Sequence, residues 1–263
     1  MKNTFVRILS AVFALALLFS FCACGDSNQT DSEYVKKNGK LRVGITDFAP
    51  IDYQNEKGEW IGFDADMAKA FAESLGVKVE FVVIDWDSKE LEIKNKNIDC
   101  VWNGMTLTDG VKEAFETSKP YMDNAQVVVL KKDIAEQYKT ADSVKTLKFA
   151  VEKDSAGDEI ITGMGVTPTR LTAQADALLE VKAGTSEACV IDLLMALAMT
   201  GEGTDYPELT YSVKLNSEQY GVGFRKGSDL AAKLNDFMKT SYDKGDTQKI
   251  AEKYNVAATL VAQ

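Results

Sequence analysis

Hydrophobic positions along this chain follow two alternating periods. The segment 77–84 alternates apolar and polar residues, and 41–45 is a short apolar run, so both are predicted to be strands. Between them, residues 63–75 place Met67, Ala70, Phe71 and Leu75 at helical spacing, and Gly76 follows as a stop signal. Strand, helix and strand in this order are typical of a βαβ unit.

The same pattern starts again in the second half of the chain. Residues 127–130 form a continuous apolar run, which predicts a buried strand that crosses from one lobe to another. Further strands are predicted at 148–151, 188–191 and 220–224, and further helices at 157–162, 173–183, 230–242 and 247–254. We therefore predict an α/β protein with two lobes, each a mostly parallel sheet flanked by helices.

The first 25 residues predict export. Lys2 and Arg7 precede the apolar run 8–21, which is shorter than the ~20 residues that a membrane span needs. The run ends at Ala23-Cys24, which resembles a bacterial lipobox, so residues 1–23 are predicted to be a lipoprotein signal peptide and Cys24 the lipidated residue. An ordinary cleaved signal with a chance cysteine is the alternative. The polar stretch 25–37 is predicted to be a flexible spacer.

Composition narrows the function. The formal charge of −10 argues against nucleic acid, which needs clustered cations. The chain has no histidine, so the commonest general base and most transition-metal sites are missing, and we expect neither a metal nor a cofactor. Once the signal has been removed and Cys24 is lipidated, only Cys100 and Cys189 remain. Buried free thiols are expected there, with a disulfide as the open alternative.

Seven further motifs, taken in chain order, resemble one family. They are the stretches 41–45, 60–70, 76–81, 85–87, 103–108, 118–121 and 220–227, which include Gly62-Phe63-Asp64 and Gly104-Met105-Thr106. This chain resembles the extracellular solute-binding proteins of bacterial ABC importers, in the polar amino-acid branch. The resemblance implies a type II periplasmic-binding-protein-like clamshell that works as a monomer. It would capture an amino acid or related amine and deliver it to an ABC permease from the outer face of the cell membrane.

The resemblance also implies boundaries. Residues 24–39 would be the lipidated cysteine and tether, 40–126 with 221–263 the first lobe, and 127–220 the second lobe with hinge strands at both ends.

The resemblance assigns roles to individual residues. Phe48 and Trp86 would be aromatic walls, and the backbones of Gly104 and Thr106 would contact the ligand. Ser155 would begin a helix whose N–H groups face the ligand carboxylate, and Asp192 would pair with the ammonium. Trp102 is a further candidate, either as part of an aromatic cage or as a core residue.

Two departures from the family pattern weaken the carboxylate site. Val111 stands where relatives usually carry an arginine, and Asp154-Ser155-Ala156 stands where they often carry Gly-Thr-Thr. Either Lys112 or helix N-termini replace the arginine, or the ligand is not a plain α-amino acid.

Two other function classes stay open at this point. An exported dehydratase-like enzyme on the same fold would need an acid in the cleft, for which Asp154 or Glu152 could serve. A ligand-sensing domain for a separate receptor is the other. The charged helix 88–96 is expected to be a solvated face.

Overall fold

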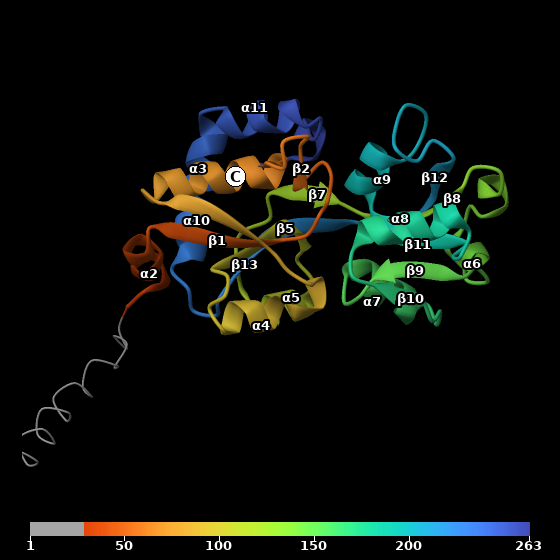
Figure 1. The fold of residues 1–263 in the computed structure, drawn as a ribbon, viewed down its shortest axis with the longest axis horizontal. Coiled ribbons are helices and arrows are strands. Elements are labelled where there is room, and N and C mark those ends of the chain that lie inside the picture. The colour runs from red at the N-terminus through yellow and green to blue at the C-terminus, as the bar shows by residue number, and fades with distance from the viewer. Residues whose placement is uncertain (1–28) are drawn as a thin grey trace, which may run out of the picture.

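The computed structural model describes residues 29–263, which form two α/β bodies side by side (Figure 1). The expected signal peptide (1–23) and Cys24 lie outside the described residues. No helix among residues 29–263 combines the length and the apolar character that crossing a membrane requires.

The first body is built on a six-stranded sheet. Its strands run in the order β4-β1-β5-β13-β6, with β7 also paired to β13. Strand β1 is parallel to β4 and β5, whereas β13 is antiparallel to β5. The strands are β1 (Lys40–Ile45), β4 (Lys78–Val83), β5 (Cys100–Thr106), β6 (Glu116–Thr117), β7 (Met122–Asn124) and β13 (Glu218–Phe224). A small pair, β2 (Tyr53–Gln54) and β3 (Trp60–Ile61), adjoins it. The helices are α2 (Asp31–Asn38), α3 (Phe63–Ser74), α4 (Lys89–Lys94), α5 (Asp109–Ala114), α10 (Leu230–Asp243) and α11 (Asp246–Lys253).

The second body has a five-stranded sheet in the order β10-β9-β11-β8-β12. The first three strands are mutually parallel, and β8 and β12 are antiparallel additions. The strands are β8 (Gln126–Lys131), β9 (Phe149–Glu152), β10 (Thr169–Leu171), β11 (Ala188–Asp192) and β12 (Leu209–Lys214). The helices are α6 (Ala141–Val144), α7 (Ala156–Gly163), α8 (Gln174–Ala183) and α9 (Leu193–Met199). The predicted fold class, two mostly parallel sheets flanked by helices, is confirmed.

Two short crossings join the bodies. The chain leaves the first sheet after Asn124 and enters the second at Gln126, and it returns between Lys214 and Glu218. The segment 218–220, which we expected in the second lobe, belongs to the first sheet because β13 already pairs there with β7.

The segment expected to be a flexible spacer is partly helical. Helix α2 begins after Thr30, whose side chain forms a capping box with Glu33. Val35 is fully buried, and Ser32 donates hydrogen bonds from its backbone N–H and its hydroxyl to Asp229 on the first body. A single apolar residue facing inward is too weak a pattern to predict this helix, so the contact to the folded body decides it.

The two cysteines are buried and free, which answers the question that the sequence left open. Cys100 lies in β5 of the first sheet and Cys189 in β11 of the second.

Candidate functional site

A cavity of about 240 Å³ lies between the two bodies, next to the crossings. Its volume is near the lower end of small-molecule sites, which start at roughly 300 Å³. Six of the seven ligand-binding candidates line it, namely Phe48, Trp86, Gly104, Thr106, Ser155 and Asp192. The fold thus brings together residues that are up to 144 positions apart in the sequence.

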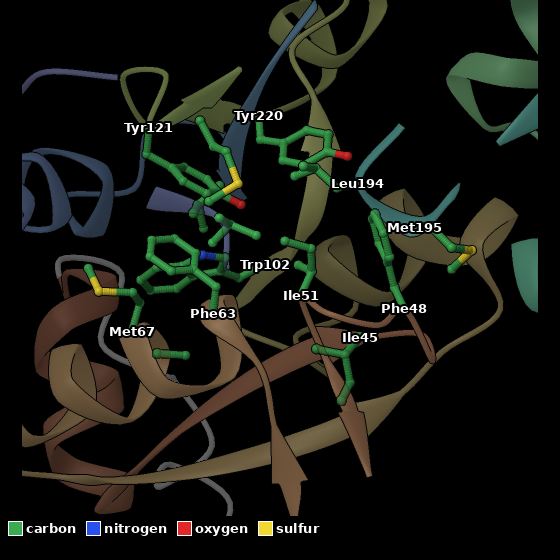
Figure 2. Close-up of a cluster of buried hydrophobic side chains, with 14 of the residues drawn as sticks. Ile45, Phe48, Ile51, Phe63, Met67, Trp102, Tyr121, Leu194, Met195 and Tyr220 are labelled. Atoms are coloured by element: carbon green, nitrogen blue, oxygen red, sulfur yellow. The ribbon is translucent and has the colours of Figure 1, made fainter. Parts of the chain in front are cut away.

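Trp102 is the exception, because of the two places that the sequence left open for it, an aromatic cage or the core, it takes the core. Its side chain is fully buried and packs against Phe71, with ring centroids 6.2 Å apart. It also packs against Tyr121, with ring centroids 6.5 Å apart (Figure 2). Side chains alternate along a strand, so Cys100 and Trp102 face one core cluster while Val101 faces the other. Trp102 is therefore a core residue.

Phe48 and Gly104 fit together at the floor of the cavity. Gly104 has φ 54°, and a Cβ on it would lie 2.7 Å from the Phe48 ring, so only glycine fits here. The Phe48 ring packs edge-to-face against Tyr220 at 6.3 Å. The backbone N–H of Gly104 donates to the carboxylate of Asp64 in α3 at 2.7 Å, and this hydrogen bond holds the end of β5 in place.

Trp86 lines the cavity together with a residue that the sequence analysis missed. Lys89 belongs to the helix that we expected to be a solvated face, but it is only 8% exposed. Its Nζ lies 4.9 Å from the centre of the Trp86 ring and donates to the carbonyls of Trp86 and Asp154, at 3.1 and 3.3 Å. Burial lowers the pKa of Lys89. Asp154 belongs to the second body, so this contact exists only because the two bodies meet.

Asp192 ends strand β11 in the centre of the site. Its Oδ1 accepts hydrogen bonds from Tyr220 at 2.6 Å, from Gln126 at 3.1 Å and from Asn124. Its Oδ2 accepts from the amide of Gln174. The carboxylate is thus held in one orientation at the carboxyl end of a strand, where open α/β sheets bind ligands.

The pKa of Asp192 is raised to about 7, first by burial and then by repulsion from Glu218. Asn124 and Gln126 each donate to Glu218 as well as to Asp192, at 2.7 and 2.8 Å for Glu218. Because Asn124 and Gln126 flank one crossing and Glu218 follows the other, this network links the site to the hinge.

Glu152 ends β9, the neighbour of β11, and also lines the cavity. Burial, followed by repulsion from Asp192, raises its pKa to about 8, while attraction to Lys89 opposes the rise. The sequence analysis named Glu152 only as a candidate acid of the enzyme alternative.

The start of α7 lies at the cavity, as the Ser155 assignment requires. Ser155 caps the helix by accepting from the backbone N–H of Asp158 at 3.2 Å. Asp154 has φ 56°, a left-handed conformation that glycine adopts most easily. This conformation agrees with the glycine that the family resemblance places at this position.

Val111 also lines the cavity, in the first turn of α5. Lys112, which was one possible replacement for the missing arginine, lies outside the set of residues that line it. Lys89 is the basic residue among those lining residues.

An ion pair closes the rim of the cleft. Lys153 of the second body and Asp87 of the first are 2.5 Å apart, Nζ to Oδ2. Together with the Lys89 contact to Asp154, it joins the two bodies across the cleft.

Known proteins share this architecture. The chain is 29% identical to the arginine-binding extracellular protein ArtP of Bacillus subtilis, over 94% of this chain and 96% of that protein. A Streptococcus pneumoniae structure described as an ABC uptake transporter substrate binding protein with bound histidine superposes with a TM-score of 0.79 at 27% identity, covering 87% of this chain and 97% of that one. The ancestral amino acid-binding protein AncCDT-1, described as a precursor of cyclohexadienyl dehydratase, gives a TM-score of 0.77 at 30% identity, covering 85% and 98%.

The family described as bacterial extracellular solute-binding proteins, family 3, matches residues 41–257, nearly the whole described chain. The fold of this chain, two bodies with a cavity at their junction, is one that can close around a bound solute. This chain belongs to the bacterial extracellular solute-binding proteins, family 3.

Proposed function

We propose that this protein captures an amino acid, or a related small solute with an amine, and delivers it to the permease of an ABC importer. The observation that carries the proposal is Asp192, a carboxylate oriented by four side-chain donors inside a cavity that both bodies enclose. Arginine and histidine appear in the names of the similar proteins, and both carry an α-ammonium group.

The remaining roles follow from the positions of the side chains. Phe48 and Trp86 present aromatic surface to the body of the solute, and the end of β5 at Gly104 and Thr106 offers backbone groups. Ser155 presents the α7 N-terminus to an anionic group. Because a solute touching both bodies stabilises their closed arrangement, binding shifts the population toward closure.

Calorimetry and thermal shift with the full chain test this proposal. The panel contains the proteinogenic amino acids, small peptides and polyamines, and a ligand at a hundredfold excess over Kd adds ~2.7 kcal/mol to the stability of the protein. Asp192→Ala should abolish binding of every amine-bearing ligand. Normal binding by this variant would refute the assignment of Asp192.

We also infer that the protein does no chemistry on its solute. A buried acid such as Glu152, with its pKa near 8, is the group that a proton-transfer enzyme on this fold would need, so the inference requires its own test. Incubation of the protein with each bound solute, followed by NMR, should return the solute unchanged.

The site of action that we propose is the outer face of the cell membrane, with a diacyl anchor on Cys24 and a monomeric soluble part. Cys24→Ala should release the protein from the membrane fraction into the medium, whereas Cys100→Ala should not. Equal retention of both variants would contradict the anchor.

A further inference from the structure

One carboxylate oxygen in the cavity has no hydrogen-bond partner among the described residues. The Glu152 residue is 3% exposed, and its Oε1 lacks a hydrogen bond from any residue in the range 29–263. A buried polar atom without a partner destabilises the folded protein, and more so when it is charged. A binding protein can keep such an atom when the ligand supplies the missing donor.

The neighbouring charges leave this carboxylate available. Lys89 is the basic residue that lines the cavity with Glu152, but its Nζ donates to the carbonyls of Trp86 and Asp154. No ion pair joins Lys89 to Glu152 within the described part of the chain. The other ionisable residues that line the cavity are all acidic, namely Asp87, Glu90, Asp154, Glu159 and Asp192.

Glu152 and Asp192 lie at the carboxyl ends of two neighbouring strands in the second sheet. Strands β9 and β11 are parallel neighbours, and each of these residues is the last of its strand. Both carboxylates therefore lie at the carboxyl ends of neighbouring strands and line the cavity, where they repel each other when both are ionised. A ligand with two positive groups would neutralise both.

We propose that Glu152 accepts hydrogen bonds from a second cationic group of the solute, so that the site selects solutes with two positively charged nitrogen groups. One of these groups faces Asp192 and the other faces Glu152. This inference rests on the proposed function and narrows its ligand to a dicationic class.

The protonation of Glu152 gives the proposal a second signature. Without ligand, burial and repulsion from Asp192 hold its pKa at about 8, against the opposing attraction of Lys89. A bound cation favours the ionised carboxylate, so binding at neutral pH releases protons. The affinity for a dication should therefore increase as the pH rises from 6 to 8.

Calorimetry on the full chain tests the inference with matched ligands. Diamino acids from 2,3-diaminopropionate to lysine, together with arginine, span the possible spacings of two cations. Citrulline and glutamine are the uncharged counterparts. At least one dication should bind tenfold or more tightly than its counterpart, and titrations in buffers of different ionisation enthalpy should show proton release.

Glu152→Gln should weaken that dication by a factor of roughly 10 to 100, the range for a hydrogen bond to a charged group, and leave citrulline unchanged. Glu159→Gln is the matched control, because it removes the same charge from an exposed residue that lines the same cavity. The control should retain the wild-type preference and proton release.

Three results would overturn the inference. Uncharged counterparts could bind as tightly as the dications, which would leave the proposed function intact. Glu152→Gln and Glu159→Gln could weaken binding of the dication equally, which would show that the effect comes from the net charge of the cavity and not from Glu152. Failure of every amino acid and amine to bind would refute the proposed function itself, and the inference with it.

Discussion

Replacing Asp192 by asparagine should make the ligand-free protein less sensitive to pH while removing amine binding. The substitution keeps the shape of the side chain. The amide oxygen can still accept from Tyr220, Gln126 and Asn124, and only the contact to Gln174 loses its acceptor. The charge is what changes.

The magnitude follows from the pKa of Asp192, which is about 7 in the folded protein against 3.8 for a free aspartate. Between these values the folded state binds more protons than the unfolded state, so the free energy of unfolding falls as the pH rises. Below about pH 4 the raised pKa of Asp192 does not lower the free energy of unfolding, and above about pH 7 the loss has reached its full size. At 1.36 kcal/mol for each pH unit, 1.36 × (7 − 3.8) gives about 4 kcal/mol, most of it between pH 5 and pH 8.

Urea unfolding of wild type and Asp192→Asn at pH 5 and pH 8 measures this directly. Wild type should lose on the order of 2–3 kcal/mol more than the variant over this interval. Asp64, with its pKa raised to about 7, changes both proteins in the same direction and cancels in the difference. Glu152 does not cancel completely, because repulsion from Asp192 contributes to its raised pKa of about 8, so the difference reports Asp192 together with its effect on Glu152. Equal pH dependence in the two proteins would refute the reasoning, because Asp192 would then titrate normally.

Three other changes test single features of the site. Val111→Arg restores the cation of the family pattern at the start of α5 and should tighten α-amino acid binding by a factor of roughly 10 to 100 in calorimetry, with weaker binding counting against a carboxylate there. Trp102→Phe leaves a gap in the core and should cost roughly 1–3 kcal/mol of unfolding free energy with no change in Kd, whereas a changed Kd at intact stability would return Trp102 to the site. Asp87→Asn removes an ion pair at the exposed rim and should speed ligand release by less than about fivefold in stopped-flow, and a hundredfold effect would show that the pair controls closure.

The sequence predicted the elements whose patterns are strong. Helix α10 spans Leu230–Asp243 against an expected 230–242, and α8 spans Gln174–Ala183 against 173–183, because each presents a repeated apolar face to the core. Strand β12 (Leu209–Lys214), an edge strand of the second sheet, was missed although its residues alternate between apolar and polar. Its position is decided by pairing with β8, which no local pattern contains.

Within the site, the sequence by itself determined which residue types stand at the strand ends. Phe48, Trp86, Gly104 and Asp192 were assigned through the resemblance of their motifs to those of the family, and all four line the cavity. The place of Trp102 stayed open because a buried strand shows no alternation of polarity, so the sequence could not tell which face each side chain takes.

Only the tertiary structure decided which charges meet. Lys89 and Asp154 are 65 positions apart, and nothing local distinguishes Lys89 from the exposed lysines near it. Glu152 and Asp192 become neighbours because β9 and β11 pair in parallel, and burial there raises both pKa values. The sequence thus determines the fold through repeated local patterns, whereas the electrostatics of the site arise from burial and long-range pairing, which exist only once the two bodies have folded and met.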